Sequence, residues 1–317
     1  MTDKTVLYYA MGGGLGHITR TFAILEEVDN TANINFRILA SSRLTHLVKG
    51  HEPYPMDEVP YEFLKSRKKY LKYIKEYLKK YDIKAIVIDT FPWGIVGEWK
   101  NLALNIPRLL IARSLKWDEY KKRMGFKYGQ FPQQCLTIER QEATYEKIIS
   151  SESKMTRIYA PIVYTESRVA QNRKLLRPDP QQNNSHSQNP PSSSDRRKWL
   201  VVHTGDRLEQ KKLLKFAKNK MKELGCTNSS LHSVFPIQRI FPASDLIKDY
   251  SYIVSGAGYN MAAMACVAGS EQKYFLLPFF RRFDDQFTRA RLIQAGGWQY
   301  NKREGAKKAG KWLIESL

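Results

Sequence analysis

The chain has 317 residues, with 52 Lys and Arg side chains against 31 Asp and Glu, which gives a formal net charge of +21. Apolar residues make up 42% of it, enough to bury a core and to exclude global disorder. No run approaches the roughly 20 uninterrupted apolar residues that a membrane-spanning helix needs. The excess positive charge favours an anionic partner, without distinguishing nucleic acid, a membrane surface and a phosphorylated substrate.

The first residues of the chain and its cysteines indicate the cellular compartment that we expect for the protein. A strand-like run over 5–11 leads directly into a glycine loop, so no cleavable signal is predicted. The cysteines Cys135, Cys226 and Cys266 are far apart and lack the C-x-x-C spacing of zinc and redox sites. We expect buried thiols in a reducing, cytoplasmic compartment.

Strands and helices alternate along the whole chain. Apolar runs predict strands over 5–11, 36–41, 85–91, 108–114, 199–205, 251–258 and 273–279. Helices are predicted between them, over about 19–28, 63–80, 94–104, 209–224 and 260–268. Short continuous apolar runs separated by helices are typical of buried parallel strands. The pattern therefore predicts two doubly wound α/β domains.

One polar segment divides the chain. Residues 177–198 contain no apolar side chain beyond proline and are dense in Ser, Asn, Gln and Pro. This composition cannot build a core and predicts a flexible linker. We therefore expect a first domain over 1–176 and a second over 199–317.

A glycine loop follows the first predicted strand. It contains Gly12, Gly13, Gly14 and Gly16 and ends at His17. Glycines here allow close approach to a ligand, and the next helix begins with free amides that favour negative charge. A dinucleotide site would instead need G-x-G-x-x-G and an acid ending the second strand, which here ends in Ala40 and Ser41. The loop is therefore interpreted as an acceptor or phosphate loop.

His17 and Asp89 form a candidate catalytic pair. His17 comes just after the glycine turn, and Asp89 ends the apolar run over 85–89. Carboxyl ends of parallel strands meet at one edge, where such folds bind ligands. A histidine titrates near neutral pH and suits a general base, and a carboxylate beside it can orient the ring. A capping histidine with no chemistry is the alternative.

Two loops in the second half are candidate donor-binding loops. Residues 255–260, S-G-A-G-Y-N, lie between a predicted strand and a predicted helix, and small residues at an open helix N-terminus suit a diphosphate. Residues 278–286 follow the next strand and end in Asp284, Asp285 and Gln286, which suit sugar hydroxyls. Each loop alone could be an ordinary strand–helix connection. Their order, together with the glycine loop, makes the pattern specific.

These three loops resemble those of the GT-B nucleotide-sugar glycosyltransferases. The likeness is carried by the glycine loop with His17, by S-G-A-G-Y-N, and by D-D-Q-x-x-R-A over 284–290. The nearest branch is glycosyltransferase family 28, which includes the enzyme that adds N-acetylglucosamine to the lipid-linked cell-wall precursor. The likeness covers both halves and is most specific over about 241–297. It implies a GT-B fold, with two Rossmann-like domains facing each other across a cleft.

The resemblance also implies roles for individual residues. The second domain would bind a UDP-sugar and the first a hydroxyl acceptor, with His17 as the base. The implied donor-binding residues are Thr204 and Gly205 for the nucleotide, Gly256, Ala257, Gly258, Tyr259 and Asn260 for the diphosphate, and Asp284, Asp285 and Gln286 for the sugar. One position departs from the family, which has a ribose-binding glutamate where this chain has Met264. Methionine cannot accept those bonds, so the nucleotide is held differently, is held weakly or is not held at all.

The implied reaction is a one-step displacement that inverts the anomeric carbon of a hexose-type sugar. No D-x-D pair or His-carboxylate cluster is present, so we expect neither a metal nor another cofactor. The main alternative is a degenerate module that holds a nucleotide sugar or tethers a partner without chemistry. A UDP-sugar 2-epimerase shares the architecture, but its additional acids and bases cannot be placed in the sequence. No nucleic-acid-binding module is recognised.

A strongly basic helix is predicted over 64–80. It carries eight Lys and Arg side chains and one Glu, with leucines, an isoleucine and tyrosines near helical spacing. An amphipathic basic helix with aromatic residues suits peripheral contact with anionic headgroups at the inner face of a membrane. The alternative is a surface helix whose apolar stripe packs on the sheet.

Overall fold

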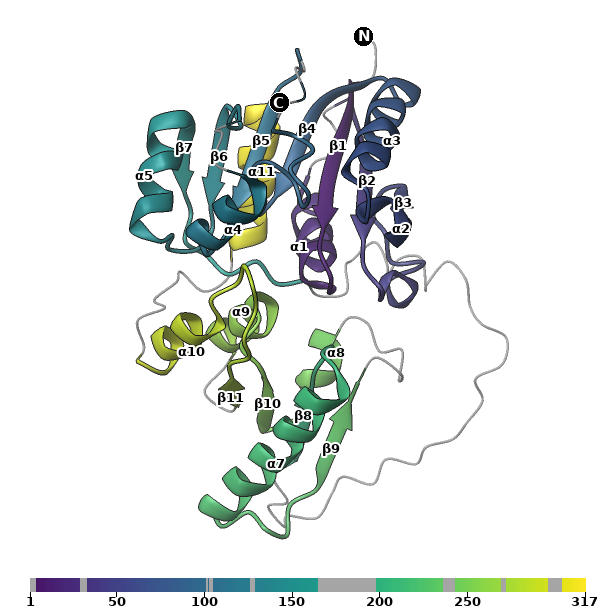
Figure 1. Cartoon of the computed structure of the whole chain (residues 1–317). Coiled ribbons are helices and arrows are strands. Elements are labelled where there is room, and N and C mark those ends of the chain that lie inside the picture. Colours follow the sequence, from purple (N-terminus) through teal and green to yellow (C-terminus); the bar gives the residue numbers. More distant parts are fainter. Residues whose placement is uncertain are drawn as a thin grey trace, which may run out of the picture. The chain divides into compact units, whose positions relative to one another are not determined.

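The computed structural model describes residues 4–28, 33–100, 102, 105–125, 129–164, 198–235, 243–268, 272–295 and 304–317 (Figure 1). The chain divides into two compact units. The first comprises Met1–Tyr164, Gly256–Ala268 and Leu276–Leu317, and the second comprises Thr165–Ser255 and Gly269–Phe275. The predicted linker over 177–198 lies outside the described residues except for Lys198, so that boundary stays a prediction.

A seven-stranded sheet of parallel strands forms the centre of the first unit. Its strand order is β3-β2-β1-β4-β5-β6-β7. The strands are β1 (Lys4–Met11), β2 (Ile34–Ser41), β3 (Met56–Glu58), β4 (Ile83–Asp89), β5 (Arg108–Ala112), β6 (Gln134–Thr137) and β7 (Lys154–Arg157). In register, Met11 is opposite Ser41 and Asp89 is opposite Ile111. The carboxyl ends of β1, β2, β4 and β5 therefore lie along one edge.

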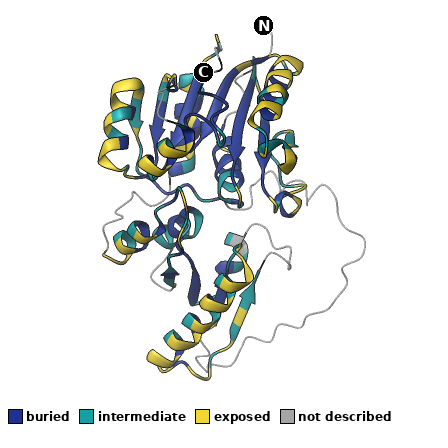
Figure 2. Ribbon diagram, viewed as in Figure 1, coloured by how far each residue is buried: buried dark blue, intermediate teal, exposed yellow. Residues whose placement is uncertain are grey.

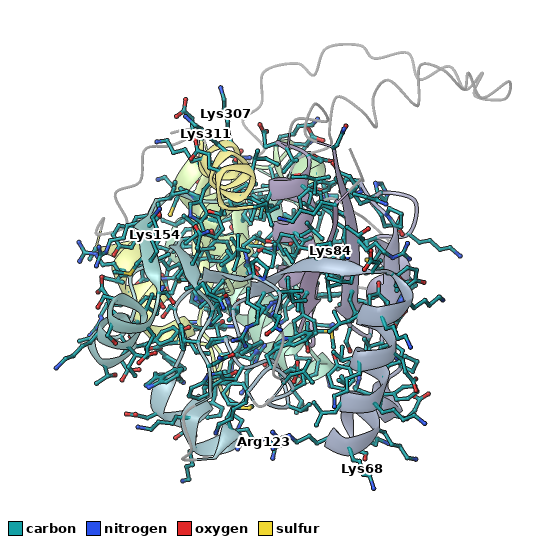
Figure 3. The ribbon with its side chains drawn as sticks, turned by 90° about the horizontal axis from the view of Figure 1, so that it is seen from above. Lys68, Lys84, Arg123, Lys154, Lys307 and Lys311 are labelled. Carbon is teal, nitrogen blue, oxygen red and sulfur yellow. The ribbon has the colours of Figure 1, made fainter. Side chains whose placement is uncertain are left out.

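Helices cover both faces of this sheet. The first unit contains α1 (Gly16–Leu25), the 3-10 helix η1 (Thr45–Leu47), α2 (Tyr61–Leu64), α3 (Arg67–Lys80), α4 (Trp117–Met124), α5 (Ala143–Glu152), α9 (Tyr259–Val267), α10 (Gln286–Gln294) and α11 (Gly305–Ser316). Helices α3, α4 and α5 contribute to one core cluster with the strands. Helix α11 lies on the other side of the sheet from α3 and α4, as the view along the strands shows (Figure 3).

Strand alternation places the apolar residues on these two faces. Along β1, Leu7, Tyr9 and Met11 join the core cluster under α3, α4 and α5, because successive side chains of a strand point to opposite faces. The cluster is rich in aromatic rings, and Trp117 of α4 stacks on Tyr145 of α5 with ring centroids 4.7 Å apart. Figure 2 shows the strands as the buried centre of the unit and the outer helix faces as exposed.

The second sheet contains four strands in the order β11-β10-β8-β9. They are β8 (Trp199–Val202), β9 (Leu231–Val234), β10 (Tyr252–Gly256) and β11 (Lys273–Leu277), accompanied by α7 (Arg207–Glu223) and α8 (Ala243–Ile247). Trp199 stacks on Tyr252 and on Phe275, with ring centroids 4.3 and 5.6 Å away. Asp206 caps α7 by accepting a hydrogen bond from the amide of Glu209 at 2.9 Å.

The predicted α/β class and the predicted strands are confirmed, but the helix predicted over 94–104 is wrong. Residues 94–100 form turns and bends instead. Gly94 and Gly97 have φ of +84° and +79°, in the left-handed region that a right-handed helix excludes. The apolar residues that suggested a helix belong to a loop with a buried polar centre.

Glu98 is the centre of this loop. Its side chain is fully buried and accepts hydrogen bonds from the Tyr9 hydroxyl and from the amides of Ile95 (3.0 Å) and Val96 (2.9 Å). Burial raises the pKa of Glu98 above its ordinary value, while the hydrogen bonds oppose that shift by favouring the ionised form. The carboxylate thus satisfies backbone donors that have no helical partner.

Replacing Glu98 by Gln should lower the free energy of unfolding by about 1–3 kcal/mol. The amide group would turn an N–H donor toward a donor of the loop, which leaves a buried polar group unpaired. Urea unfolding of the two proteins measures the difference. Glu76→Gln, at an exposed position of α3, is the matched control and should change stability by less than about 0.5 kcal/mol. Equal stabilities of Glu98→Gln and the wild type would contradict this account.

Candidate active site

Polar side chains follow four neighbouring strands of the first sheet at the points where the strands end. His17 comes shortly after β1, Asp89 is the last residue of β4, Arg113 directly follows β5, and Glu139 lies two residues after β6. These strands are parallel and adjacent, so their ends share one edge. The structure therefore places on one edge both residues of the predicted catalytic pair and two charged residues that the sequence reasoning did not select.

His17 and Asp89 are in direct contact, as the sequence predicts. The Nδ1 atom of His17 is hydrogen-bonded to Oδ2 of Asp89. Arg20 binds the same carboxylate with two groups, Nε to Oδ1 at 2.8 Å and Nη2 to Oδ2 at 2.5 Å. His17 and Arg20 are three residues apart on α1 and so project from the same side of that helix. One helix thus supplies both partners of a single carboxylate.

The charges of this trio follow from burial and pairing. Asp89 is fully buried, which by itself would raise its pKa, but Arg20 and His17 lower the pKa well below the ordinary range. Burial lowers the pKa of His17, and this effect exceeds the opposing effect of Asp89. At neutral pH the site therefore holds an ionised carboxylate and a neutral imidazole. The Nδ1 atom carries the proton donated to Asp89, which leaves the lone pair on Nε2.

The position of the His17 ring depends on Gly12. A Cβ atom at Gly12 would collide with Cδ2 and Nε2 of the ring, whereas at Gly13 and Gly14 it would meet nothing within 4 Å. On another side the ring stacks on Phe91, with ring centroids 5.6 Å apart and planes inclined by 26°. Backbone and aromatic ring together define the place of the imidazole. Of the three consecutive glycines, only Gly12 is required sterically by the ring.

Thr90, directly after Asp89, has an unusual backbone conformation. Its φ is +73°, which is strained for a β-branched residue and costs about 1–3 kcal/mol. The residue is fully buried, and its amide donates to the carbonyl of Ile111 at 2.9 Å. Its hydroxyl accepts a hydrogen bond from Nη2 of Arg20 at 3.3 Å. The surrounding contacts hold this strained residue next to the proposed catalytic carboxylate.

A second charged cluster lies in the same unit and involves the loop before α10. Arg289 donates Nε to Oε1 of Glu139 (2.7 Å), Nη2 to Oε2 of Glu139 (3.1 Å) and to Oδ1 of Asp284 (2.7 Å), and Nη1 to the carbonyl of Ala257 (3.1 Å). Arg113 lies 3.3 Å from the same Asp284 oxygen. Burial would raise the pKa of Asp284, but Arg113 and Arg289 lower it well below the ordinary range. Asp284 is thus an ionised, paired residue.

The start of α9 contacts α1 through two side chains. The amide of Asn260 donates a hydrogen bond to the hydroxyl of Thr19. The ring of Tyr259 lies 4.8 Å from the Arg20 guanidinium, and its hydroxyl accepts a hydrogen bond from the amide of Ile162 at 3.1 Å. The predicted diphosphate loop therefore lies beside the helix that carries His17.

The remaining predicted site residues have local roles in the structure. Asp285 caps α10 by accepting from the amide of Thr288 at 3.1 Å, and Gln286 accepts from the amide of Phe279 at 3.0 Å. Gly258 lies near the Gln286 amide group, and Gly16 opens α1 beside Asn260. Thr204 and Gly205 belong to the second compact unit, after β8. Their predicted binding roles stay predictions.

Sequence reasoning missed Arg20, Arg113, Glu139 and Arg289. Arg113 and Glu139 follow apolar runs just as Asp89 ends one, so the same signal could have found them. Arg289 lies within the D-D-Q-x-x-R-A pattern but was not selected. Arg20 is one of several basic residues near helix starts, and only the fold shows that it faces Asp89.

Neither a metal site nor a membrane span is found in the described part of the chain. Within it, no group of three or more His, Cys, Asp or Glu side chains is arranged to hold a metal ion. None of the described helices is long and apolar enough to cross a membrane.

Comparison with known proteins identifies the fold. No known family profile and no curated protein matches the chain. A spinosyn rhamnosyltransferase complexed with thymidine diphosphate matches over 99% of this chain and 91% of its own, with 11% identity and a TM-score of 0.57. The glycotransferase of kitacinnamycin matches over 100% and 93%, with 11% identity and a TM-score of 0.57. The UDP-GlcNAc 2-epimerase from Neisseria meningitidis matches over 99% of both chains, with 12% identity and a TM-score of 0.55. The chain has the GT-B fold.

Replacing Gly12 by Ala should displace the His17 ring and break its hydrogen bond to Asp89, because the new methyl group would occupy the space of the ring. The readout is the low-field NMR resonance of the proton on Nδ1, which should disappear. Gly13→Ala and Gly14→Ala are matched controls with open space around the added carbon and should keep the resonance. Loss of the resonance in all three variants, or in none, would show that Gly12 has no special role.

Proposed function

We propose that the protein is an inverting glycosyltransferase that moves a hexose-type sugar from a UDP-sugar to a hydroxyl group of an acceptor. The observation that carries the proposal is the Arg20–Asp89–His17 trio at the carboxyl edge of the sheet, beside the start of α9. A neutral, oriented imidazole backed by a buried anion is suited to remove a proton from a hydroxyl group.

The proposed reaction is a single displacement at the anomeric carbon. The acceptor oxygen bonds to the anomeric carbon as the bond from that carbon to the diphosphate oxygen breaks. Nε2 of His17 takes the hydroxyl proton, and Asp89 stabilises the resulting imidazolium. The nucleoside diphosphate leaves with the bonding electron pair, and the amides at the start of α9 are suited to stabilise its growing charge. We propose that no metal or other cofactor takes part.

The choice of donor rests on the resemblance to family 28 and on the fold. Among the matching structures, the rhamnosyltransferase is complexed with thymidine diphosphate and the epimerase is bound to UDP-GlcNAc, and both ligands contain pyrimidine nucleoside diphosphates. In this chain we assign the loops over 256–260 and 284–286 to the donor, and nucleotide binding by Thr204 and Gly205 stays a prediction. Met264, half-buried on α9, takes the place of the ribose-binding glutamate. The assignment therefore predicts a weaker hold on ribose than that residue would give.

A UDP-sugar 2-epimerase is the second candidate. The observation that favours it is one cluster of Glu139, Asp284, Arg113 and Arg289, in which Arg113 and Asp284 are electrostatically coupled to His17. Proton NMR of UDP-GlcNAc incubated with the protein separates the two candidates. A transferase releases UDP only when a hydroxyl acceptor is added, whereas an epimerase changes the configuration at C2 without acceptor. A degenerate binding module does neither.

Peripheral contact with an anionic membrane is a further part of the proposal. On α3, Tyr70, Ile74, Tyr77 and Leu78 are buried in the core, so the apolar stripe is not available to lipid. The lysines of the opposite side are exposed, and labelled basic side chains of α3, β4, α4, β7 and α11 lie on several sides of the unit (Figure 3). Such a contact would be electrostatic, would suit a lipid-linked acceptor, and would place the protein at the cytoplasmic face.

Replacing His17 by Ala should reduce turnover about 10²–10⁴-fold, because the general base is lost, while donor affinity stays within about twofold. Release of UDP from UDP-GlcNAc and UDP-glucose with mixed hydroxyl acceptors measures turnover, and calorimetry measures donor affinity. The exposed His46→Ala is the control. Because the pKa of His17 is lowered, kcat/KM should rise with pH and pass its half-maximal value below pH about 6.5, the ordinary pKa of histidine. Full turnover of His17→Ala would remove the assignment of the base.

Flotation with phosphatidylserine vesicles tests the membrane contact. We expect binding at low salt and release at about 0.5 M salt, since screening weakens exposed charges. A triple change of Lys68, Lys72 and Lys75 to Glu should abolish flotation. The matched change of Lys211, Lys212 and Lys215, exposed on α7, should leave most of it. Equal flotation of both variants would contradict a contact through α3.

A further inference from the structure

Arg113 has fewer direct partners than the other arginines of the site, Arg20 and Arg289. It directly follows β5 and is 9% exposed. Arg20 makes two hydrogen bonds to Asp89, and Arg289 makes four hydrogen bonds to its partners. Arg113 has an ion pair of 3.3 Å with an Asp284 oxygen that Arg289 already holds at 2.7 Å. Within the described residues, its buried Nε has no hydrogen-bond partner, which is also true of Nη1 of Arg20 and Nε of Arg108, although those two arginines bind other groups directly.

Among the described residues, the buried guanidinium of Arg113 has one ion-pair partner, an Asp284 oxygen that it shares with Arg289. The group carries five N–H donors in a fixed plane, and burying donors without partners is unfavourable. Glu139 and Asp284 balance the charges of Arg289 and Arg113, so charge neutrality does not require a further anion. What is missing is an acceptor for the donors of Arg113. Planar guanidinium donors fit the oxygens of a phosphate or a carboxylate.

Arg113 is also electrostatically coupled to His17. Burial is the main cause that lowers the pKa of His17, and the positive charges of Arg20 and then Arg113 contribute in the same direction. An anion bound at Arg113 would offset that charge and make protonation of the imidazole easier. Occupancy of Arg113 and the basicity of His17 are therefore linked.

We propose that Arg113 binds an anionic oxygen of the substrate, from a phosphate or a carboxylate, next to His17. The inference rests on the proposed function only for the origin of that oxygen, which is either the diphosphate of the donor or an anionic group on the acceptor. Binding of this group makes His17 a stronger base at the moment when the acceptor hydroxyl is present. Arg113 is then a residue that contacts substrate and also tunes the base.

The test measures binding and the His17 resonance without turnover. UDP and inorganic phosphate are titrated separately into the wild type, Arg113→Gln and Arg113→Lys, and the imidazole signal assigned with His17→Gln is followed by NMR. Arg108→Gln is the matched control, because Arg108 is a buried arginine at the opposite end of β5 and bonds to Trp99 and Gln130. Thermal unfolding verifies that each variant is folded. If Arg113→Gln does not fold, Arg113→Lys replaces it in the test, because that variant keeps the positive charge.

We expect saturation with the bound anion to raise the pKa of His17 in the wild type, and Arg113→Gln to weaken that anion about 10–100-fold and remove the shift. If UDP is weakened, the oxygen belongs to the donor diphosphate; if only phosphate is weakened, it belongs to an acceptor group. Arg113→Lys should weaken binding less, and Arg108→Gln should change it less than about twofold.

Unchanged affinity of Arg113→Gln for both probes, or no binding of either to the wild type at millimolar concentration, overturns the proposal. These results do not depend on sugar transfer, so failure of the His17→Ala assay would count against the proposed function alone.

Discussion

The carboxylate of Asp89 is fully buried and ionised, and the organisation of the site depends on the partners that keep it so. An unpaired carboxylate in such a place would cost several kcal/mol. Arg20 provides the compensating charge, and this leaves Asp89 free to orient His17 as a neutral acceptor of protons. Gly12, Phe91 and the strained Thr90 then define where the carboxylate and the ring lie. All of these contacts serve to hold the buried carboxylate and the imidazole bound to it.

The second charged cluster joins segments that are distant in the sequence. Arg289 binds Glu139, 150 residues earlier in the chain, and Arg113 forms an ion pair with Asp284. Buried ion pairs contribute little net stability, but they tolerate few alternative arrangements, because one unpaired charge is costly. We infer that these pairs mainly determine how α9 and α10 pack against the strand ends. The GT-B fold places the strand ends along one edge of the sheet. The charged pairs determine how α9 and α10 pack against that edge.

Much of the fold and part of the site follow from the sequence, for reasons that particular residues show. Apolar runs predict the longer strands but not the short strands β3, β6, β7 and β9. Because parallel strands end together, His17 and Asp89 could be paired from the sequence alone. Arg20 could not, because its partner depends on how α1 rotates against β4. The helix predicted over 94–104 is wrong because the spacing of apolar residues does not reveal that two glycines have positive φ. Nor does it reveal that the Glu98 carboxylate accepts hydrogen bonds from backbone amides of the loop. On α3 the pattern is right, but whether its stripe meets lipid or core is decided by neighbouring strands.

The division of the chain into compact units has a consequence for dissecting the protein. The segments Gly256–Ala268 and Leu276–Leu317 pack in the same unit as Met1–Tyr164, although a polar stretch separates them in the sequence. A cut at that stretch would place Arg289 and Asp284 on one fragment and Glu139 and Arg113 on the other. Each fragment would carry half of a charge network, with its buried charges left unpaired. The two pieces are therefore expected to complement each other when mixed and to be poorly soluble apart, so the natural unit of study is the whole chain.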